Sequence, residues 1–321
     1  MAACPHERRG RLSWTRPRAL RPGDLIGVCA PAGAVDARRL AAGVSALEGL
    51  GFRVRVSPEI LERKLFSAGS VERRVDELHG LFADGDVAGV VCARGGAGVS
   101  PLLDRLDAEL LRRNPKVFVG YSDATLLHLF LNRLGLVTFH GPMVAVELAD
   151  GGYDPASLLR AVSGGGAPWS VEAPGMRPLR DGEAVGRLEG GCLSLLAAAA
   201  GTGWGAGPPD PEERTILLVE DADEPPYRLH RMLTQLRQSG GLGGVDGLVF
   251  GEMRGCAPSS GDGYSLDDVL LDALGGLDVP VAIGLPCGHS PSPMVTLPLG
   301  ARVRLRCGAA ARLELTEPWL A

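Results

Sequence analysis

The first half of this chain alternates short apolar strands with amphipathic helices, and no other feature of the sequence constrains the fold as much. Leu25–Ala30 is a continuous apolar run, as expected for a strand buried on both faces. The next predicted elements, in order, are a helix at Asp36–Leu50, a strand at Phe52–Val56, a helix at Ser70–Asp84 and strands at Val87–Cys92 and Lys116–Val119. Strands that alternate with helices form mostly parallel sheets. We therefore predict an N-terminal α/β domain with a parallel sheet over residues 21–150.

The second half of the chain differs in composition and in its pattern of predicted elements. Residues 151–180 are rich in Gly, Pro and Ala, which is typical of a linker between domains. Short strands follow, with two helices predicted at Cys192–Ala200 and Tyr227–Ser239. This pattern predicts a smaller, mainly β C-terminal domain over residues 181–321. Residues 1–20 are basic and lack the apolar core of a secretory signal, so we expect a disordered lead-in there.

Composition narrows the function classes. A formal net charge of −5 argues against nucleic acid or an anionic membrane as the main partner, and no apolar run approaches the ~20 residues of a membrane helix. The seven cysteines are scattered and form no C-x-x-C pair, so neither a zinc site nor a disulfide framework is indicated. A reducing cytoplasm is the expected location.

A short turn, Gly120-Tyr121-Ser122-Asp123, joins one predicted strand to a helical segment, Ala124–Leu131. A serine on a sharp strand-to-helix turn is how α/β enzymes expose a nucleophilic hydroxyl, and the helix N-terminus behind it favours negative charge. The turn does not match G-x-S-x-G, however, and Ser or Asp at such a place commonly caps the helix that follows. The turn alone leaves two interpretations of Ser122, a nucleophile or a helix cap.

Polar residues also follow strands in the second half. Glu220 continues the apolar run Ile216–Val219, and three more acids come next, at Asp221, Asp223 and Glu224. Such carboxylates either hold a divalent cation or form a solvated turn before a helix. His289 follows the strand Val281–Leu285, and His140 is a second candidate histidine. A single histidine after a strand is more often structural than catalytic.

Ser122, Glu220 and His289 together supply a nucleophile, an orienting carboxylate and a base. In such a triad His289 takes the serine proton, and Glu220 fixes its tautomer and supports the imidazolium. The order Ser, Glu, His matches that of the α/β-hydrolases, although a domain change between Ser122 and Glu220 does not fit that fold.

A glycine-rich loop, Arg94-Gly95-Gly96-Ala97-Gly98, follows the strand Val87–Cys92. It lacks both G-x-G-x-x-G and the P-loop Gly-Lys-Ser/Thr, which disfavours a nucleotide site. Because glycine lets a backbone N–H approach a ligand closely, we expect an oxyanion-hole donor near Ser122. The alternative is a plain turn at the end of a strand.

These residues resemble the LD-carboxypeptidases of serine peptidase family S66, which include the microcin C immunity-type peptidases. The motifs run in family order from about Arg21 to the C-terminus. They are Arg21-Pro22-Gly23-Asp24, Arg94-Gly95-Gly96, Gly120-Tyr121-Ser122-Asp123, Phe139-His140-Gly141-Pro142-Met143, Gly190-Gly191-x-Leu193-Ser194, Glu220-Asp221-x-Asp223-Glu224, Gly288-His289 and Thr296-Leu297-Pro298-Leu299-Gly300.

The resemblance implies an α/β N-terminal domain, a mainly β C-terminal domain and an active site in the cleft between them. It implies the triad Ser122–His289–Glu220 and an oxyanion hole from the backbone N–H groups of Asp123 and the glycine loop, at Gly96. Further substrate-binding candidates are Arg94, Gly95, Tyr121 and His140. The resemblance implies no metal or cofactor, and a cytoplasmic homodimer. From the net charge we expect neither nucleic acid nor membrane as a partner.

The chain departs from the family pattern where the substrate would lie. Ala97 replaces the usual Tyr of the glycine loop, and Pro101 stands where an Arg is usual. Cys192 replaces the Asn of Gly-Gly-Asn-Leu, and Gly-His-Gly-x-x-Asn reads Gly288-His289-Ser290-Pro291-Ser292-Pro293. Losing an Arg and a Tyr removes a carboxylate partner and an aromatic wall.

The reaction typical of the family cuts the bond between an L-centre, usually meso-diaminopimelate, and a terminal D-Ala in a murein tetrapeptide. We therefore expect a cofactor-independent serine carboxypeptidase that acts on a small peptide with a free C-terminal carboxylate, with Arg94 or main-chain N–H groups as the carboxylate anchor. Two alternatives stay open. One is a detoxifying amidase that hydrolyses a peptidyl-nucleotide antibiotic, and the other is a non-catalytic peptide-binding relative.

Overall fold

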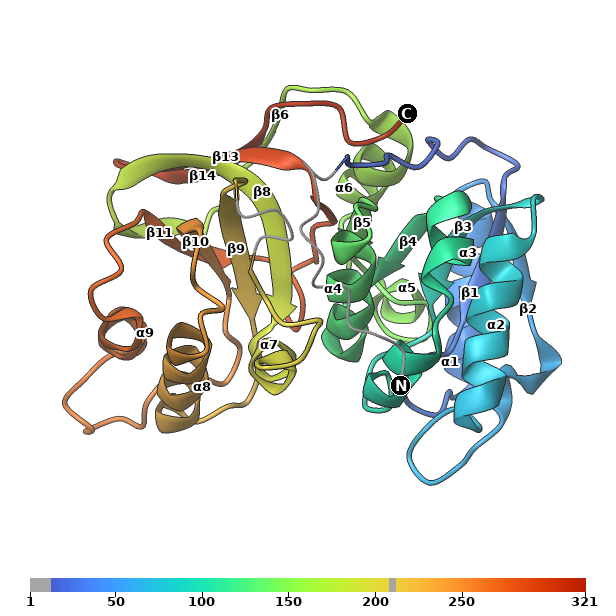
Figure 1. Ribbon diagram of the computed structural model, residues 1–321, viewed down its shortest axis with the longest axis horizontal. Coiled ribbons are helices and arrows are strands. Elements are labelled where there is room, and N and C mark those ends of the chain that lie inside the picture. The colour runs from blue at the N-terminus through green and yellow to red at the C-terminus, as the bar shows by residue number, and fades with distance from the viewer. Residues whose placement is uncertain (1–12, 208–211) are drawn as a thin grey trace.

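Two sheets organise the chain, one in each of two lobes (Figure 1). The computed structural model describes residues 13–207 and 212–321. The first sheet has six strands in the order β12-β5-β4-β3-β1-β2, and all neighbours are parallel except β12, which runs antiparallel to β5. Its strands are β1 Leu25–Cys29, β2 Arg53–Val56, β3 Val87–Cys92, β4 Val117–Gly120, β5 Thr138–His140 and β12 Leu297–Leu299.

Helices cover both faces of this sheet, because its central strands are buried throughout, as in β1 and β4. Buried residues of α2, α3 and α4 form one core with the sheet, and those of α1, α5 and α6 form another. The helices of this lobe are α1 Ala37–Gly49, α2 Val71–Ala83, α3 Ala108–Arg113, α4 Thr125–Arg133, α5 Glu147–Asp150 and α6 Pro155–Leu159. Short 3₁₀ helices are at Pro58–Leu61, Ser100–Arg105 and Ser122–Ala124, and Arg160–Gly164 is a π-helical turn.

The second sheet has eight strands in the order β6-β14-β13-β8-β9-β10-β11-β7. Its central strands β8, β9, β10 and β11 are parallel, and the others pair antiparallel. The strands are β6 Trp169–Val171, β7 Arg177–Arg180, β8 Gly182–Cys192, β9 Thr215–Glu220, β10 Val245–Gly251, β11 Val281–Leu285, β13 Arg302–Cys307 and β14 Ala311–Leu315. Three helices pack on one face: α7 Leu193–Ala199, α8 Pro226–Gln238 and α9 Leu266–Leu274.

The two-domain α/β architecture is thus confirmed, but the predicted details of the second half need correction. The C-terminal domain is built on a sheet, as predicted, but its parallel strands require helical crossovers, and α7, α8 and α9 pack on one face of that sheet. The predicted linker 151–180 contains α6, β6 and β7, and the two strands form opposite edges of the second sheet. Strand β12 belongs to the first sheet although it lies within 181–321.

The expected disordered lead-in is also wrong for its described part. Thr15 forms a β-bridge with Leu136, and the indole of Trp14 donates to Glu213 at 2.8 Å. Leu20 is only 3% exposed. The β-bridge, the indole hydrogen bond and the burial of Leu20 therefore hold residues 13–20 on the fold, while the rest of the lead-in lies outside the described residues. No helix in the described ranges has the length and apolar character needed to cross a bilayer.

The parallel strands of both sheets end at the boundary between the lobes. In the first sheet, the glycine-rich segment follows β3, Ser122 lies in the turn after β4, and β5 ends at His140. In the second sheet, β9 ends at Glu220, and His289 follows β11. Helix α4 packs against β8 and α7 across the boundary. Ligands of open parallel sheets bind beyond the carboxyl ends of the strands, so this edge is where a site is expected.

Candidate active site

Ser122 occupies a strained turn between β4 and α4. Its φ is +61°, in the left-handed region that a non-glycine residue rarely adopts. Neither Ser122 nor Asp123 caps the helix, because α4 begins after Ala124 with no side-chain cap. Asp123 instead accepts the main-chain N–H of Val99 at 2.9 Å. The helix-cap interpretation is therefore wrong, and the conformation is that of an exposed-nucleophile turn.

The glycine-rich loop lies directly against Ser122. A Cβ on Gly95 would sit 2.7 Å from Ser122 Oγ, so only glycine fits there. The N–H groups of Gly95 and Gly96 donate to no acceptor within the described part of the chain. Arg74 holds the loop by donating to the carbonyl of Gly98 at 2.6 Å. The arrangement leaves backbone donors beside the serine, as an oxyanion hole requires. The prediction named Gly96 and Asp123 for this role, and the N–H of Gly95 is a further candidate donor.

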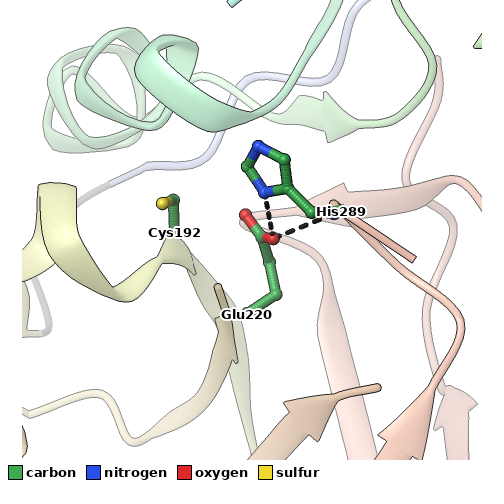
Figure 2. Close-up of side chains that lie close together, drawn as sticks. All are labelled: Cys192, Glu220 and His289. Carbon is green, nitrogen blue, oxygen red and sulfur yellow. Dashed lines mark hydrogen bonds and ion pairs between the residues drawn. The ribbon is translucent and has the colours of Figure 1, made fainter. Parts of the chain in front are cut away.

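Glu220 and His289 form a buried acid–base pair. One carboxylate oxygen of Glu220, Oε2, accepts both the ring Nδ1–H of His289 at 2.8 Å and its main-chain N–H at 3.0 Å. Figure 2 shows that the other ring nitrogen, Nε2, points away from Glu220. Gly288 is required for this approach, because a Cβ there would lie 2.2 Å from the Glu220 carboxyl group. The pair holds the imidazole with Nε2 available to a proton donor.

The charges of this pair are mutually stabilising. Burial by itself raises the pKa of Glu220, whose side chain is 1% exposed, but the nearby imidazole of His140 and the hydrogen bonds and charge of His289 outweigh it and hold the pKa at about 2. For His289, burial lowers the pKa, and the hydrogen bond and charge of Glu220 raise it above the ordinary value. An ionised Glu220 can only accept hydrogen bonds, so Nδ1 carries the proton.

Tyr121 connects the serine turn to His289. Its ring packs edge-on against the imidazole with centroids 5.0 Å apart, and its hydroxyl donates to Glu147 at 2.6 Å. Because Tyr121 immediately precedes Ser122, this contact places the Ser122 turn close to His289. Within the described residues no hydrogen bond joins Ser122 Oγ to His289. Ser122 and His289 therefore both lie at the lobe boundary, without a hydrogen bond between their side chains.

Glu147, at the start of α5, is a site residue that the sequence reasoning missed. Burial raises the pKa of this carboxyl group, which also accepts the main-chain N–H of Met143 at 3.1 Å. The only sequence signal is an acid within the apolar stretch Met143–Leu148.

His140 and Tyr121 were predicted to bind substrate, but both are buried behind the triad. His140 is 0% exposed and Tyr121 is 3% exposed. The Nε2 atom of His140 lies 3.9 Å from Glu220 Oε1, too far for a direct hydrogen bond. Direct substrate contact is therefore incompatible with this structure, and both residues instead support the acid–base pair.

Arg94 is exposed, in the manner expected of a substrate anchor, and its guanidinium contacts the carbonyls of Gly95 and Ala34 at 3.2 and 3.3 Å. Near it, a mostly apolar cavity of about 960 Å³ begins at Ala97 and Gly98 and extends between α4 and α7. Phe130 and Trp204 line it, with ring centroids 4.7 Å apart.

The acidic residues Asp221, Asp223 and Glu224, which follow β9, have separate partners and do not form a shared cation site. Asp221 accepts the N–H of Ser194, Asp223 pairs with Arg254, and Glu224 pairs with Arg228. In the ranges that the structure describes, the potential metal ligands that cluster are Cys192, Glu220 and His289 (Figure 2). The solvated-turn interpretation therefore holds for Asp223, while Glu224 is mostly covered beside Arg228 and Glu220 is fully buried.

Known proteins match this chain over most of its length, in both lobes. Residues 26–141 match the profile of the LD-carboxypeptidase N-terminal domain, and residues 185–305 match that of the LD-carboxypeptidase C-terminal domain. A probable murein peptide carboxypeptidase of Bacillus subtilis is 35% identical over 296 residues, which cover 90% of this chain and 91% of the relative. The microcin C7 self-immunity protein MccF of Escherichia coli is 29% identical over 333 residues, covering 93% and 94%.

A solved structure agrees with these relatives. The muramoyltetrapeptide carboxypeptidase of Oxalobacter formigenes superposes with a TM-score of 0.81 at 31% identity, covering 92% of this chain and 99% of that one. Its fold, and the family profiles on both lobes, match the two-domain architecture described above. The chain belongs to the LD-carboxypeptidase family of S66 peptidases.

Proposed function

We propose that this protein is a serine carboxypeptidase that hydrolyses the bond between an L-centre and a C-terminal D-amino acid, D-Ala, in a murein tetrapeptide or a similar peptide. The observation that carries the proposal is the Glu220–His289 pair, whose free Nε2 lies at the same lobe boundary as the strained Ser122 turn. Membership of the family supports a peptidase, and the identity of the bond and the acyl-enzyme route are our inference.

In the first half-reaction, His289 Nε2 takes the proton of Ser122 as Oγ bonds to the scissile carbonyl carbon. The negative charge that develops on the carbonyl oxygen is stabilised by the N–H groups of Gly95, Gly96 and Asp123. Collapse of this intermediate breaks the C–N bond, and His289 passes its proton to the departing amine of the D-amino acid. An ester between the remaining peptide and Ser122 is left.

The second half-reaction returns the enzyme to its starting state. His289 removes a proton from water, the resulting hydroxide bonds to the ester carbon, and the Ser122 oxygen leaves with that proton. Glu220 stays ionised throughout, since its pKa of about 2 lies far below neutral pH. Its role is to stabilise the imidazolium that forms twice in each cycle.

Arg94 is the best candidate for binding the substrate carboxylate. It is exposed, lies in the loop that faces Ser122, and has no carboxylate partner within the described residues. The apolar cavity that begins at Ala97 gives room for a bulky group on the acyl side. Ala97 and Pro101 stand where the family usually has Tyr and Arg. This chain would therefore contact its substrate through different side chains from those of a typical murein peptidase.

A second candidate function is hydrolysis of a peptidyl-nucleotide antibiotic. It is favoured by the similarity to the microcin C7 self-immunity protein and by the partly exposed ring of Trp204 in the cavity, which packs on the buried Phe130 and offers a surface for a planar group. The chemistry would be the same, with a different leaving group.

The test is a hydrolysis panel read by mass spectrometry. The purified protein is incubated with a murein tetrapeptide ending in D-Ala, its analogue ending in L-Ala, and an aspartyl acyl-amide nucleotide. We expect release of D-Ala from the first alone, loss of turnover in Ser122→Ala, and normal turnover in Ser239→Ala, a serine at the end of α8. Preferential cleavage of the nucleotide would support the second function. Binding of peptide without any cleavage would support a non-catalytic relative and contradict the proposal.

We also propose that the protein acts in the cytoplasm as a homodimer, as the family resemblance implies. Light scattering on the purified chain would test the assembly, and a monomer at micromolar concentration would contradict it.

A further inference from the structure

The thiol of Cys192 lies beside the acid–base pair. Cys192 is the last residue of β8, and its Sγ, an oxygen of Glu220 and a ring nitrogen of His289 all lie within 4.8 Å of one another (Figure 2). Sγ has one polar contact with the described residues, Ser194 Oγ at 3.2 Å. Burial, with the charges of Glu220 and Asp221, raises the pKa of the thiol, so it does not compete with Ser122 as a nucleophile at neutral pH.

A second observation points to a ligand at the same place. Glu220 Oε1 is fully buried and accepts no hydrogen bond from the described residues. The nearest donor candidate is His140 Nε2 at 3.9 Å, and neither ring nitrogen of His140 has a partner among those residues. A buried, ionised carboxylate oxygen without a donor is costly, and a cation or a polar ligand would relieve that cost.

We propose that Cys192, Glu220 and His289 form a binding site for a single Zn²⁺ ion, and that zinc bound there reversibly blocks hydrolysis. Thiolate, imidazole and carboxylate are the ligands that Zn²⁺ prefers, whereas Mg²⁺ and Ca²⁺ prefer oxygen ligands alone. Water would complete a tetrahedral set around the ion.

The geometry is close to what the ion needs. Zinc bonds of about 2.0–2.3 Å place tetrahedral ligand atoms roughly 3.3–3.8 Å apart. The 2.8 Å contact between Glu220 Oε2 and His289 Nδ1 would open slightly, and the thiol would move inward. On binding, the Cys192 thiol and the His289 Nδ1 each release a proton to solvent. Zinc affinity therefore rises with pH.

The blocking effect rests on the proposed function, because it assumes that His289 is the base. With zinc on Nδ1 and on the carboxylate, Glu220 no longer accepts the Nδ1–H and His289 no longer gains from its charge. The imidazolium that the reaction needs would then form beside a metal cation. Turnover would stop until a chelator removes the ion.

Metal binding is tested without using activity. The chelator-treated protein is titrated with Co²⁺, whose thiolate complex gives a near-ultraviolet charge-transfer band, and with Zn²⁺ by equilibrium dialysis. We expect one ion per chain in the wild type and in Cys307→Ser, a cysteine on β13 far from the pair. In Cys192→Ser the band should disappear and zinc affinity should fall at least about tenfold. Circular dichroism checks that this variant is folded, and Cys192→Asn serves as a second replacement.

The outcomes separate the two proposals. A wild type without the thiolate–cobalt band, or a band that persists in both Cys192 variants, would overturn the zinc site. Binding with unchanged hydrolysis at saturating zinc would overturn the block. If the metal-free protein hydrolyses no peptide while the cobalt band forms as expected, the proposed function fails and the zinc site stands.

Discussion

Replacing Glu220 by glutamine tests how much the buried charge contributes to catalysis. Gln keeps the shape of the side chain and removes its charge. Folding lowers the pKa of Glu220 from 4.5 to about 2, and this difference corresponds to roughly 3 kcal/mol of net stabilisation of the ionised carboxylate, after the cost of its burial. His289 contributes to this stabilisation through both hydrogen bonds to Oε2. If the transition state contains the imidazolium, loss of the Glu220 charge lowers kcat/KM by about a hundredfold.

The assay is the rate of D-Ala release by Glu220→Gln over a range of peptide concentrations. Glu189→Gln is a matched control. Glu189 is also buried, on β8, but burial raises its pKa to about 8, so at neutral pH the change exchanges one mostly neutral group for another. Its kcat/KM should stay near the wild-type value. A Glu220→Gln enzyme within threefold of wild type would refute the reasoning.

The same substitution has a predicted effect on stability against pH. Since folding lowers the pKa of Glu220, the ionised carboxylate stabilises the fold at neutral pH, and this stabilisation is lost as pH falls from 4.5 toward 2. Unfolding by urea at pH 6, 4 and 3 should show a steeper loss of stability in wild type than in Glu220→Gln. Equal slopes would contradict the low pKa.

Three further predictions concern the parts around the pair. In Gly95→Ala the new Cβ would lie 2.7 Å from Ser122 Oγ, so we expect kcat to fall by about a hundredfold with melting temperature little changed; normal kcat would contradict the oxyanion role of this loop. The acidic limb of the kcat/KM–pH profile should lie above pH 6.5, because Glu220 raises the pKa of His289, and a limb below that value would contradict the pairing. Tyr121→Phe removes the hydroxyl that donates to the partly buried Glu147, so urea unfolding should show a loss of about 1–3 kcal/mol, and an unchanged free energy of unfolding would contradict this contact.

The positions of the three proposed triad residues were predictable because each lies at the end of an apolar strand or within a few residues after it. Ser122, Glu220 and His289 lie at strand ends that the periodicity identifies, and parallel strands bring such ends to one edge. The helix-cap alternative for Ser122 could not be excluded from sequence. It depends on where α4 begins and on the Asp123–Val99 hydrogen bond, which is a long-range contact.

The supporting residues were harder to predict because their roles come from tertiary packing. Tyr121 reaches Glu147 and His289 across elements that are distant in sequence, and nothing local distinguishes it from a substrate contact. Strand β12 joins the first sheet after the chain has completed most of the second, a crossover that no local pattern specifies. Helix α9 was missed although Ser265 and Asp268 form a capping box at its start.

The most direct test of the account is the identity of the nucleophile. The protein is treated with a serine-directed phosphonate or trapped with peptide substrate during turnover, digested, and mapped by mass spectrometry. The account predicts one adduct, on Ser122, that is absent from Ser122→Ala and strongly reduced in His289→Ala. An adduct on Cys192, or peptide turnover that persists in Ser122→Ala, would contradict it.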